Sequence, residues 1–133
     1  MDALEAGDED TACWAAFEAR VSPERGQVLR YSVAAGEGAR PLWAAASGAL
    51  AAGGAPACRR CGAARRFELQ LMPQLLHYMG VEARDPDLLD WATVAVYTCE
   101  RSCGGEGSGG YVEEFAWVQL HPPAPGMAAG WPL

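Results

Sequence analysis

The fold of this chain of 133 residues depends on two short stretches, Cys58-Arg59-Arg60-Cys61-Gly62 and Cys99-Glu100-Arg101-Ser102-Cys103-Gly104. Each stretch places two cysteines close together and ends in a glycine. One tight turn can aim two thiolates at a point about 2.3 Å away, the Zn–S bond length, and the glycine tolerates the left-handed backbone that turns N–H groups toward sulfur. The spacing therefore predicts one structural Zn²⁺ held by Cys58, Cys61, Cys99 and Cys103.

Two other interpretations of the cysteines stay open. Buried free cysteines can be paired in a sequence by accident, and paired thiols can also perform redox chemistry. A redox-active thiol is usually activated at a helix N-terminus, whereas Cys58 and Cys61 are expected to precede a strand. Four thiolates and one Zn²⁺ leave excess negative charge, which a dry site tolerates poorly unless cations lie nearby. The cysteine pairs are flanked by such cations, namely Arg59, Arg60, Arg65, Arg66 and Arg101.

The pattern of apolar residues predicts the secondary structure. Strict alternation indicates a half-buried strand over 66–71, with Phe67, Leu69 and Leu71 on one face. The other expected elements are a helix over 12–21 behind an acidic start at 8–11, strands over 27–32, 91–98 and 111–119, a compact helix over 72–80 and a loop over 36–56. Together they predict an α+β fold with a mainly antiparallel β-sheet, one N-terminal helix and one short helix, and with Cys₄ zinc knuckles at one edge of the sheet.

This reading divides the chain into three parts. Residues 1–9 are expected to be a disordered acidic start, residues 10–120 a single domain, and residues 121–133 a proline-rich disordered tail. The fifth cysteine, Cys13, is expected to be a packing residue on the first helix. The predicted core consists of Phe67, Leu69, Leu71, Leu75, Trp91, Val94, Val96, Phe115 and Trp117.

Charge and motifs exclude several classes of function. The net charge of −7 is unfavourable for binding a nucleic acid, because each phosphate contact needs a local cation. No apolar run is long enough to span a membrane, and the acidic N-terminus does not resemble a signal peptide. The adjacent carboxylates Glu113 and Glu114 are expected on opposite faces of a strand, and the glycine-rich run 104–110 lacks the Lys-Ser/Thr of a phosphate loop. We therefore expect no enzymatic activity and no catalytic residues.

Four blocks of sequence, in order, resemble one known family. They are Gln27-Val28-Leu29-Arg30-Tyr31 with Pro41-Leu42-Trp43, the run from Cys58 through Arg65-Arg66-Phe67-Glu68-Leu69 to Leu76, Asp90-Trp91 through Cys99 with Ser102-Cys103, and Tyr111-Val112-Glu113-Glu114-Phe115 to Gln119. The region 10–120 is similar to the C-terminal domain of the programmed cell death protein 2 family. Members of that family are much longer, so functions that need their N-terminal half are not expected of this chain alone.

The resemblance implies a non-enzymatic role in making the small ribosomal subunit. Family members act as chaperones or adaptors for a newly made small-subunit ribosomal protein, in the cytoplasm and also in the nucleus. Ribosomal proteins are basic, so an acidic monomer that holds one is electrostatically reasonable. The expected contact surface lies near Glu68, Gln70 and Gln74, whose side chains leave the apolar alternation. The alternative is a zinc-ribbon-like module that binds nucleic acid through the arginines around the cysteines.

Overall fold

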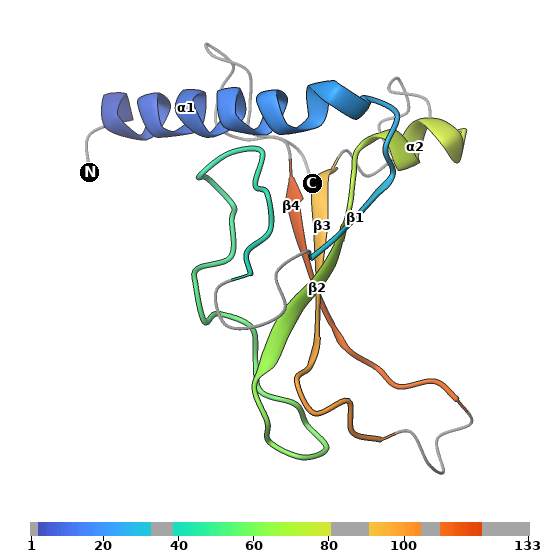
Figure 1. Ribbon diagram of the computed structural model, residues 1–133. Helices are drawn as coiled ribbons and strands as arrows, with labels where there is room; N and C mark the ends of the chain where they lie inside the picture. The colour runs from blue at the N-terminus through green and yellow to red at the C-terminus, as the bar shows by residue number, and fades with distance from the viewer. Residues whose placement is uncertain (1–2, 33–38, 81–90, 105–109, 121–133) are drawn as a thin grey trace.

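The computed structural model describes residues 3–32, 39–80, 91–104 and 110–120 (Figure 1). Four antiparallel strands form one sheet in the order β1-β2-β3-β4, and a long helix lies across one end of it (Figure 1). The fold is therefore α+β, as the sequence predicts. The elements are α1 (Ala3–Val21), a short 3₁₀ turn (Ser22–Glu24), β1 (Leu29–Tyr31), β2 (Arg65–Leu71), α2 (Gln74–Tyr78), β3 (Trp91–Cys99) and β4 (Phe115–Leu120).

The element boundaries follow the sequence patterns with two clear exceptions. The last strand, expected over 111–119, is β4 over Phe115–Leu120, so the prediction that Glu113 and Glu114 lie in a strand is wrong. Helix α1 begins at Ala3, so the prediction of a disordered start over 1–9 is wrong for residues 3–9. The run Ala3-Leu4-Glu5-Ala6 has high helix propensity, and acidic residues near a helix N-terminus interact favourably with its dipole. Among the described helices, none combines the length and hydropathy needed to cross a bilayer. The predicted tail, 121–133, lies outside the described residues.

One face of the sheet is covered by α1 and by the irregular segment 39–58. At the α1 end, Phe17 and Val21 of the helix pack with Met72 and with the small side chains of Ala44 and Ala92. Further along the same face, Phe67, Ala95 and Tyr97 form a second buried cluster. Its half-buried neighbours are Ala39, Trp43, Leu50, Ala55, Phe115 and Trp117. We call this covered side of the sheet the inner face.

Two buried glutamines attach the segment 39–58 to the inner face. Gln70 accepts a hydrogen bond from the N–H of Leu42 and donates one to its carbonyl, at 2.7 and 3.0 Å. Gln119 accepts from the N–H of Ala44 at 3.1 Å and donates to the carbonyls of Ala45 and Ser47 at 2.7 and 3.0 Å. Each glutamine thus supplies the partners that a neighbouring strand would otherwise give to the loop backbone.

The core prediction is wrong for Leu69, Leu71, Val94 and Val96. A β-bulge between Phe67 and Leu69 adds one residue to β2, and this reverses the alternation of every later residue in the strand. Phe67 therefore lies on the inner face with Gln70 and Met72, whereas Leu69 and Leu71 lie on the opposite side. The four aliphatic residues are half-buried on that opposite side, and among the predicted core residues only Phe67 and Trp91 are fully buried.

Candidate metal centre

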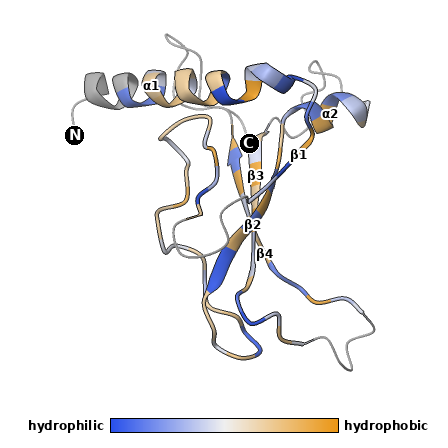
Figure 2. Cartoon of the chain, in the orientation of Figure 1, coloured by the Kyte–Doolittle hydropathy of each residue, from blue (hydrophilic) through white to orange (hydrophobic). Residues whose placement is uncertain are grey.

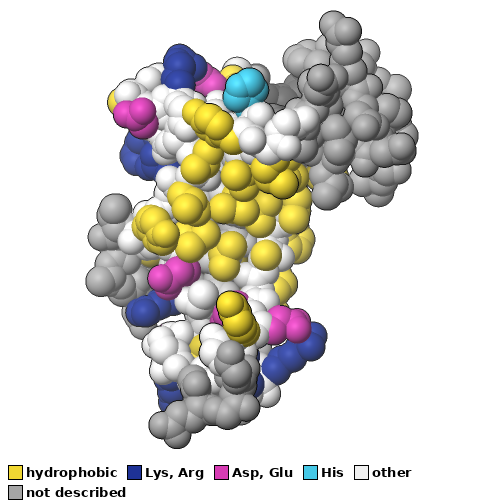
Figure 3. All heavy atoms as spheres, turned by 90° about the vertical axis from the view of Figure 1, so that its right-hand side faces the viewer, with side chains coloured by type: hydrophobic (Ala, Val, Ile, Leu, Met, Phe, Trp, Pro, Cys, Tyr) yellow, Lys and Arg dark blue, Asp and Glu magenta, His cyan; other side chains and the backbone are white. Residues whose placement is uncertain are grey.

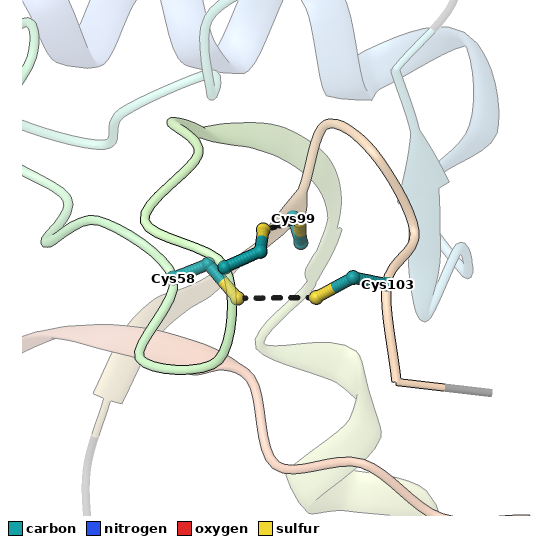
Figure 4. A group of neighbouring side chains, drawn as sticks. Cys58, Cys99 and Cys103 are labelled. Carbon is teal, nitrogen blue, oxygen red and sulfur yellow. Dashed lines mark hydrogen bonds between the residues drawn. The ribbon is translucent and has the colours of Figure 1, made fainter. Parts of the chain in front are cut away.

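All four predicted cysteine ligands lie together, and Figure 4 shows Cys58, Cys99 and Cys103 of this cluster. The turns that carry the cysteines lie at the end of the sheet remote from α1 (Figure 1). The four sulfur atoms lie within 4.8 Å of one another. The Sγ atoms of Cys58 and Cys103 are 3.5 Å apart, and those of Cys61 and Cys99 are 3.6 Å apart. A tetrahedron with Zn–S bonds of about 2.3 Å has sulfurs about 3.8 Å apart, whereas a disulfide bond is about 2.05 Å long. The cysteines are free, and their spacing fits a tetrahedral metal ion.

The two cysteine pairs sit on similar turns. In the first turn, the N–H of Cys58 donates to the carbonyl of Ala63 at 2.8 Å, and Gly62 has a φ of 78°. In the second, Gly104 has a φ of 86°. Both glycines therefore adopt the left-handed backbone that the sequence predicts for them, a conformation that costs a residue with a side chain about 1–2 kcal/mol.

The turns point backbone donors at the first sulfur of each pair. The N–H groups of Cys61 and Arg60 lower the pKa of the Cys58 thiol from its usual range to about 6. The N–H groups of Cys103 and Arg101 likewise lower the pKa of Cys99, against the opposing effect of burial. Both turns therefore favour the thiolate of their first cysteine, which is the form that binds metal.

The pKa of the Cys103 thiol shows why the cluster suits a cation. Hydrogen bonds from the Cys103 thiol to Cys58 and to Cys61, together with burial, raise the pKa of Cys103 to about 12. Without a metal, a proton is thus retained among the sulfurs to separate their negative charges. A divalent ion bound by the same four atoms supplies that positive charge and replaces the proton.

A carboxylate that the sequence analysis did not assign links the two turns. Glu114 accepts a short hydrogen bond from Arg60 and another, at 2.8 Å, from the N–H of Cys99. The oxygen that accepts from Cys99 also lies 3.4 Å from Nε of Arg65. Burial raises the pKa of Glu114, but the bonds from Arg60 and Cys99 and the charge of Arg65 outweigh it, so the net pKa is lowered. Glu114 in turn raises the pKa of Arg60.

Arg60 also interacts with the sulfurs of Cys103 and Cys58, where it offsets part of the excess negative charge of a Cys₄ site, and Glu114 joins it to Arg65. The beginning of β2, next to the cysteine turns, is accordingly hydrophilic (Figure 2). The sequence analysis identified the flanking arginines as cations for the site. For Glu113 and Glu114 it predicted only that their side chains lie on opposite faces of a strand. Nothing in the pattern shows that the second glutamate reaches the N–H of a metal ligand.

The predicted partner-binding residues do not form one surface. Gln70 is only 2% exposed, so the expectation that its side chain faces a partner's surface is wrong, because the bulge in β2 turns it inward. Glu68 is half-buried and accepts a hydrogen bond from the Thr98 hydroxyl at 3.1 Å. Gln74 is half-buried at the start of α2. Partner binding by Glu68 and Gln74 stays a prediction.

Outside the cluster, the described residues show no arrangement typical of catalysis. Cys13 donates from its thiol to the carbonyl of Trp43 at 3.2 Å, and burial raises its pKa, so it is not an activated nucleophile. His77 is exposed on α2 beside Tyr78. A groove of about 360 Å³ between α1, β1 and segment 39–42 contains Arg20, Arg30 and Arg40, but its lining includes no carboxylate, histidine or cysteine.

Comparison with known proteins assigns the family. Residues 11–120 match the C-terminal domain of programmed cell death protein 2. The chain belongs to this family. The programmed cell death protein 2 of Bos taurus is 41% identical over 103 residues, and that of Mus musculus is also 41% identical over 103 residues. The programmed cell death protein 2-like protein of Gallus gallus is 41% identical over 107 residues.

The matched region covers most of this chain but a small part of each relative. It spans 77% of the chain and 28% of the Bos taurus programmed cell death protein 2, and 80% of the chain and 26% of the Gallus gallus protein. No solved structure is significantly similar to the chain. The match to the programmed cell death protein 2 domain includes both cysteine turns and all four strands, so the candidate metal centre lies within the family domain.

Proposed function

We propose that the chain is a zinc-stabilised, non-enzymatic protein-binding module that acts as a chaperone or adaptor for a basic small-subunit ribosomal protein. The observation that carries this proposal is the convergence of four cysteine sulfurs in an acidic member of the programmed cell death protein 2 family. The ion would be held by Cys58, Cys61, Cys99 and Cys103, and when bound it supplies cross-links between two loops that are distant in sequence.

The ligand set supports a structural role for the ion. A catalytic zinc keeps one coordination position for water or substrate, whereas a Cys₄ site fills all four positions with protein sulfur. Glu114 binds Arg60, Arg65 and the backbone N–H of Cys99, and Arg60 also donates to the carbonyl of Glu113, so these residues hold the loops together. This arrangement favours a folded scaffold over an active site.

Charge supports a basic client over a nucleic acid. With a net charge of −7, the molecule attracts a cationic protein at long range and repels a polyanion. Two of the five arginines that favour the nucleic-acid alternative are engaged inside the protein: Arg60 by Glu114, and Arg65 by Glu114 and the carbonyl of Pro56. We propose that the module works in the cytoplasm and in the nucleus, where a new ribosomal protein needs protection before assembly.

Elemental analysis of the purified chain tests the metal. We expect one zinc per chain, and we expect Cys58→Ser to lose the zinc and to unfold, because structural zinc contributes directly to folding. Cys13→Ser is the matched control, because Cys13 is a cysteine of the same chain outside the cluster. A wild-type chain that contains no zinc, together with a folded Cys58→Ser protein, would show that the cysteines are ordinary packing residues.

A binding assay tests the client. Purified small-subunit ribosomal proteins are presented to the immobilised chain, with an acidic ribosomal protein and a small-subunit rRNA fragment as comparisons. We expect retention of a basic ribosomal protein that weakens as salt is raised. If no ribosomal protein is retained, even when the remaining part of a longer relative is added, the chaperone proposal fails. Tight rRNA binding with a steep salt dependence would instead favour the nucleic-acid alternative.

A further inference from the structure

The side of the sheet opposite α1 carries two complete apolar rows. The strand register aligns Leu29, Leu71, Val94 and Val118 in one row. It aligns Tyr31, Leu69, Val96 and Ala116 in the next row. Because residues paired across antiparallel strands point to the same side, these eight side chains form one surface across all four strands. We call this surface the open face.

The open face is exposed to a degree that is unusual for aliphatic side chains on a sheet. Leu29 is 40%, Tyr31 64% and Val118 46% exposed, and Leu120 beside them is 37% exposed. Figure 3 shows the hydrophobic side chains gathered in one continuous patch on this side of the molecule. Neither α1 nor the described segment 39–58 contributes to covering it, since both pack on the inner face.

Both faces of the sheet carry apolar side chains, and the buried polar ones lie on the covered face. The inner face contains Gln70, Thr93 and Gln119 beside its apolar clusters, whereas the eight residues of the open face are all aliphatic or aromatic. The bulge in β2 produces this distribution, because it directs Gln70 inward and Leu69 and Leu71 outward. An exposed apolar patch bordered by polar groups marks an interaction site in soluble proteins. The polar border is supplied at one end by Arg66 and by Glu68 with its partner Thr98.

The size of the open face distinguishes between occupants. The four strands, about 4.8 Å apart, span about 14 Å, and the two rows lie about 7 Å apart along the strands. Two such patches pressed together bury far less than the roughly 800 Å² per partner of a stable dimer. A single α-helix, about 10–12 Å in diameter with its side chains, is wide enough to cover both rows when it lies across the strands. The dimensions therefore favour one helix over a second copy of this chain.

We propose that the open face docks one amphipathic helix of a basic partner, with the helix's apolar side against the two rows. The inference rests on the proposed function, because it assigns the surface that would hold the basic client. The net charge of −7 selects a cationic polar side for that helix. The described border of the open face carries Arg66 and Glu68, which have opposite charges, so apolar contact supplies the affinity and the field of the whole molecule supplies the charge preference.

Three synthetic peptides of equal length test the occupant with the full chain. One forms an amphipathic helix with a lysine-rich polar side, the second is a scrambled sequence of the same composition, and the third replaces each lysine by glutamate. We expect only the first to bind, and to shift the backbone amide resonances of Leu69, Leu71, Val94 and Val96 in ¹⁵N-labelled protein. Equal binding of the scrambled peptide, or shifts confined to other residues, would overturn the proposal.

A matched pair of variants tests the surface. Tyr31→Lys puts a charge on the open face, and Tyr111→Lys makes the same change at a tyrosine that is 89% exposed outside it. We expect Tyr31→Lys to weaken binding of the lysine-rich helix about tenfold and Tyr111→Lys to leave it unchanged. Val118→Lys, on the opposite edge of the open face, provides a second variant if Tyr31→Lys does not fold. Equal binding by both folded tyrosine variants contradicts the proposal.

The remaining outcomes separate this inference from the proposed function. If the chain dimerises at micromolar concentration and Val118→Lys abolishes the dimer, the occupant is a second copy and the helix proposal is wrong. If the wild type and Val118→Lys retain a ribosomal protein equally well, the client binds elsewhere: the chaperone function stands and the open face is not its site. If the helix binds but no ribosomal protein does, the open-face inference stands and the chaperone function fails.

Discussion

Gln70 and Gln119 show how single polar side chains can replace a missing strand. Each satisfies backbone groups of the irregular segment 41–47, and together they account for five hydrogen bonds to that segment. Thr93 lies between them on β3 and accepts a hydrogen bond from Gln70 at 3.0 Å. A fully paired polar group is tolerated in a core, whereas an unpaired one is costly.

The first prediction concerns Gln119, whose side chain is fully buried. Gln119→Leu keeps the approximate size but leaves the N–H of Ala44 and the carbonyls of Ala45 and Ser47 without their partner. We expect the free energy of unfolding to fall by about 3 kcal/mol, since each unsatisfied buried group costs about 1–3 kcal/mol. Urea unfolding followed by circular dichroism measures this loss.

The control for this prediction is Gln27→Leu. Gln27 also hydrogen-bonds through its side chain, to the carbonyl of Glu24 and to Arg30, but near the surface. We expect its substitution to cost less than about 1 kcal/mol. Similar losses for the two variants would mean that the buried bonds of Gln119 contribute no more than surface bonds.

The burial of the two glutamines could not be predicted from the sequence. The partner of Gln70 is Leu42, in a segment with no periodic pattern, and glutamine is usually an exposed residue. The cysteine ligands were different, because residue type and spacing together specify their chemistry. All four were predicted, and the structure brings all four together.

At the scale of elements, the two cysteine turns differ in what surrounds their glycines. A Cβ added at Gly104 would lie 2.7 Å from Nε of Arg60, whereas a Cβ at Gly62 would meet nothing within 4 Å. Both glycines have positive φ, 86° and 78°. Alanine substitutions at these two glycines would both strain the backbone, but only the one at Gly104 would also displace Arg60. Comparing them therefore separates the two effects.

The second prediction compares Gly104→Ala with Gly62→Ala. We expect each to cost about 1–2 kcal/mol through left-handed strain. Gly104→Ala should in addition weaken metal binding about tenfold, because it displaces the guanidinium that joins the cysteine turns through Glu114. Competition with a chromogenic chelator measures the affinity. Equal affinities for the two variants would show that Arg60 does not support the metal centre.

The sequence predicted the bounds of β2 and β3 well, but it did not predict which side chains of β2 face the covered side of the sheet. The residue types and alternation of 66–71 and 91–98 identify β2 and β3 within one residue at each end. The bulge after Phe67 depends on how β2 pairs with β3, a contact between segments distant in sequence. Local alternation does not contain that information, so Leu69 and Leu71 were assigned to the wrong face.

At the scale of the whole molecule, the metal centre and the main apolar core lie at opposite ends of the sheet (Figure 1). The cysteine end contains only a small buried cluster, Cys58, Ala63 and Cys99 with Cys103 against it. The core at the α1 end relies on small side chains such as Ala44 and Ala92. Neither of these two clusters contains many large apolar side chains, so we expect a bound metal to contribute a large part of the stability.

The third prediction is that metal removal unfolds the domain. Structural zinc contributes about 10–16 kcal/mol to small zinc-binding peptides, which is comparable with the whole stability of a domain this size, about 5–15 kcal/mol. We expect a strong chelator at neutral pH to abolish the cooperative thermal transition, and added Zn²⁺, but not Mg²⁺, to restore it. If elemental analysis shows that the metal has been lost and the thermal transition nevertheless persists, the core folds without the ion.

The bulge in β2 makes the character of the sheet surface depend on one residue. Deleting Glu68 would remove the bulge and place Leu69 directly after Phe67, so Leu69 and Leu71 would still point away from the inner face and Gln70 would still point into it. If β2 instead kept Glu68 but paired with β3 without the bulge, Leu69 and Leu71 would face inward, and Gln70 would lose its hydrogen bonds to Leu42. The exposure of the aliphatic side chains and the attachment of the loop are therefore both consequences of one unpaired position in β2.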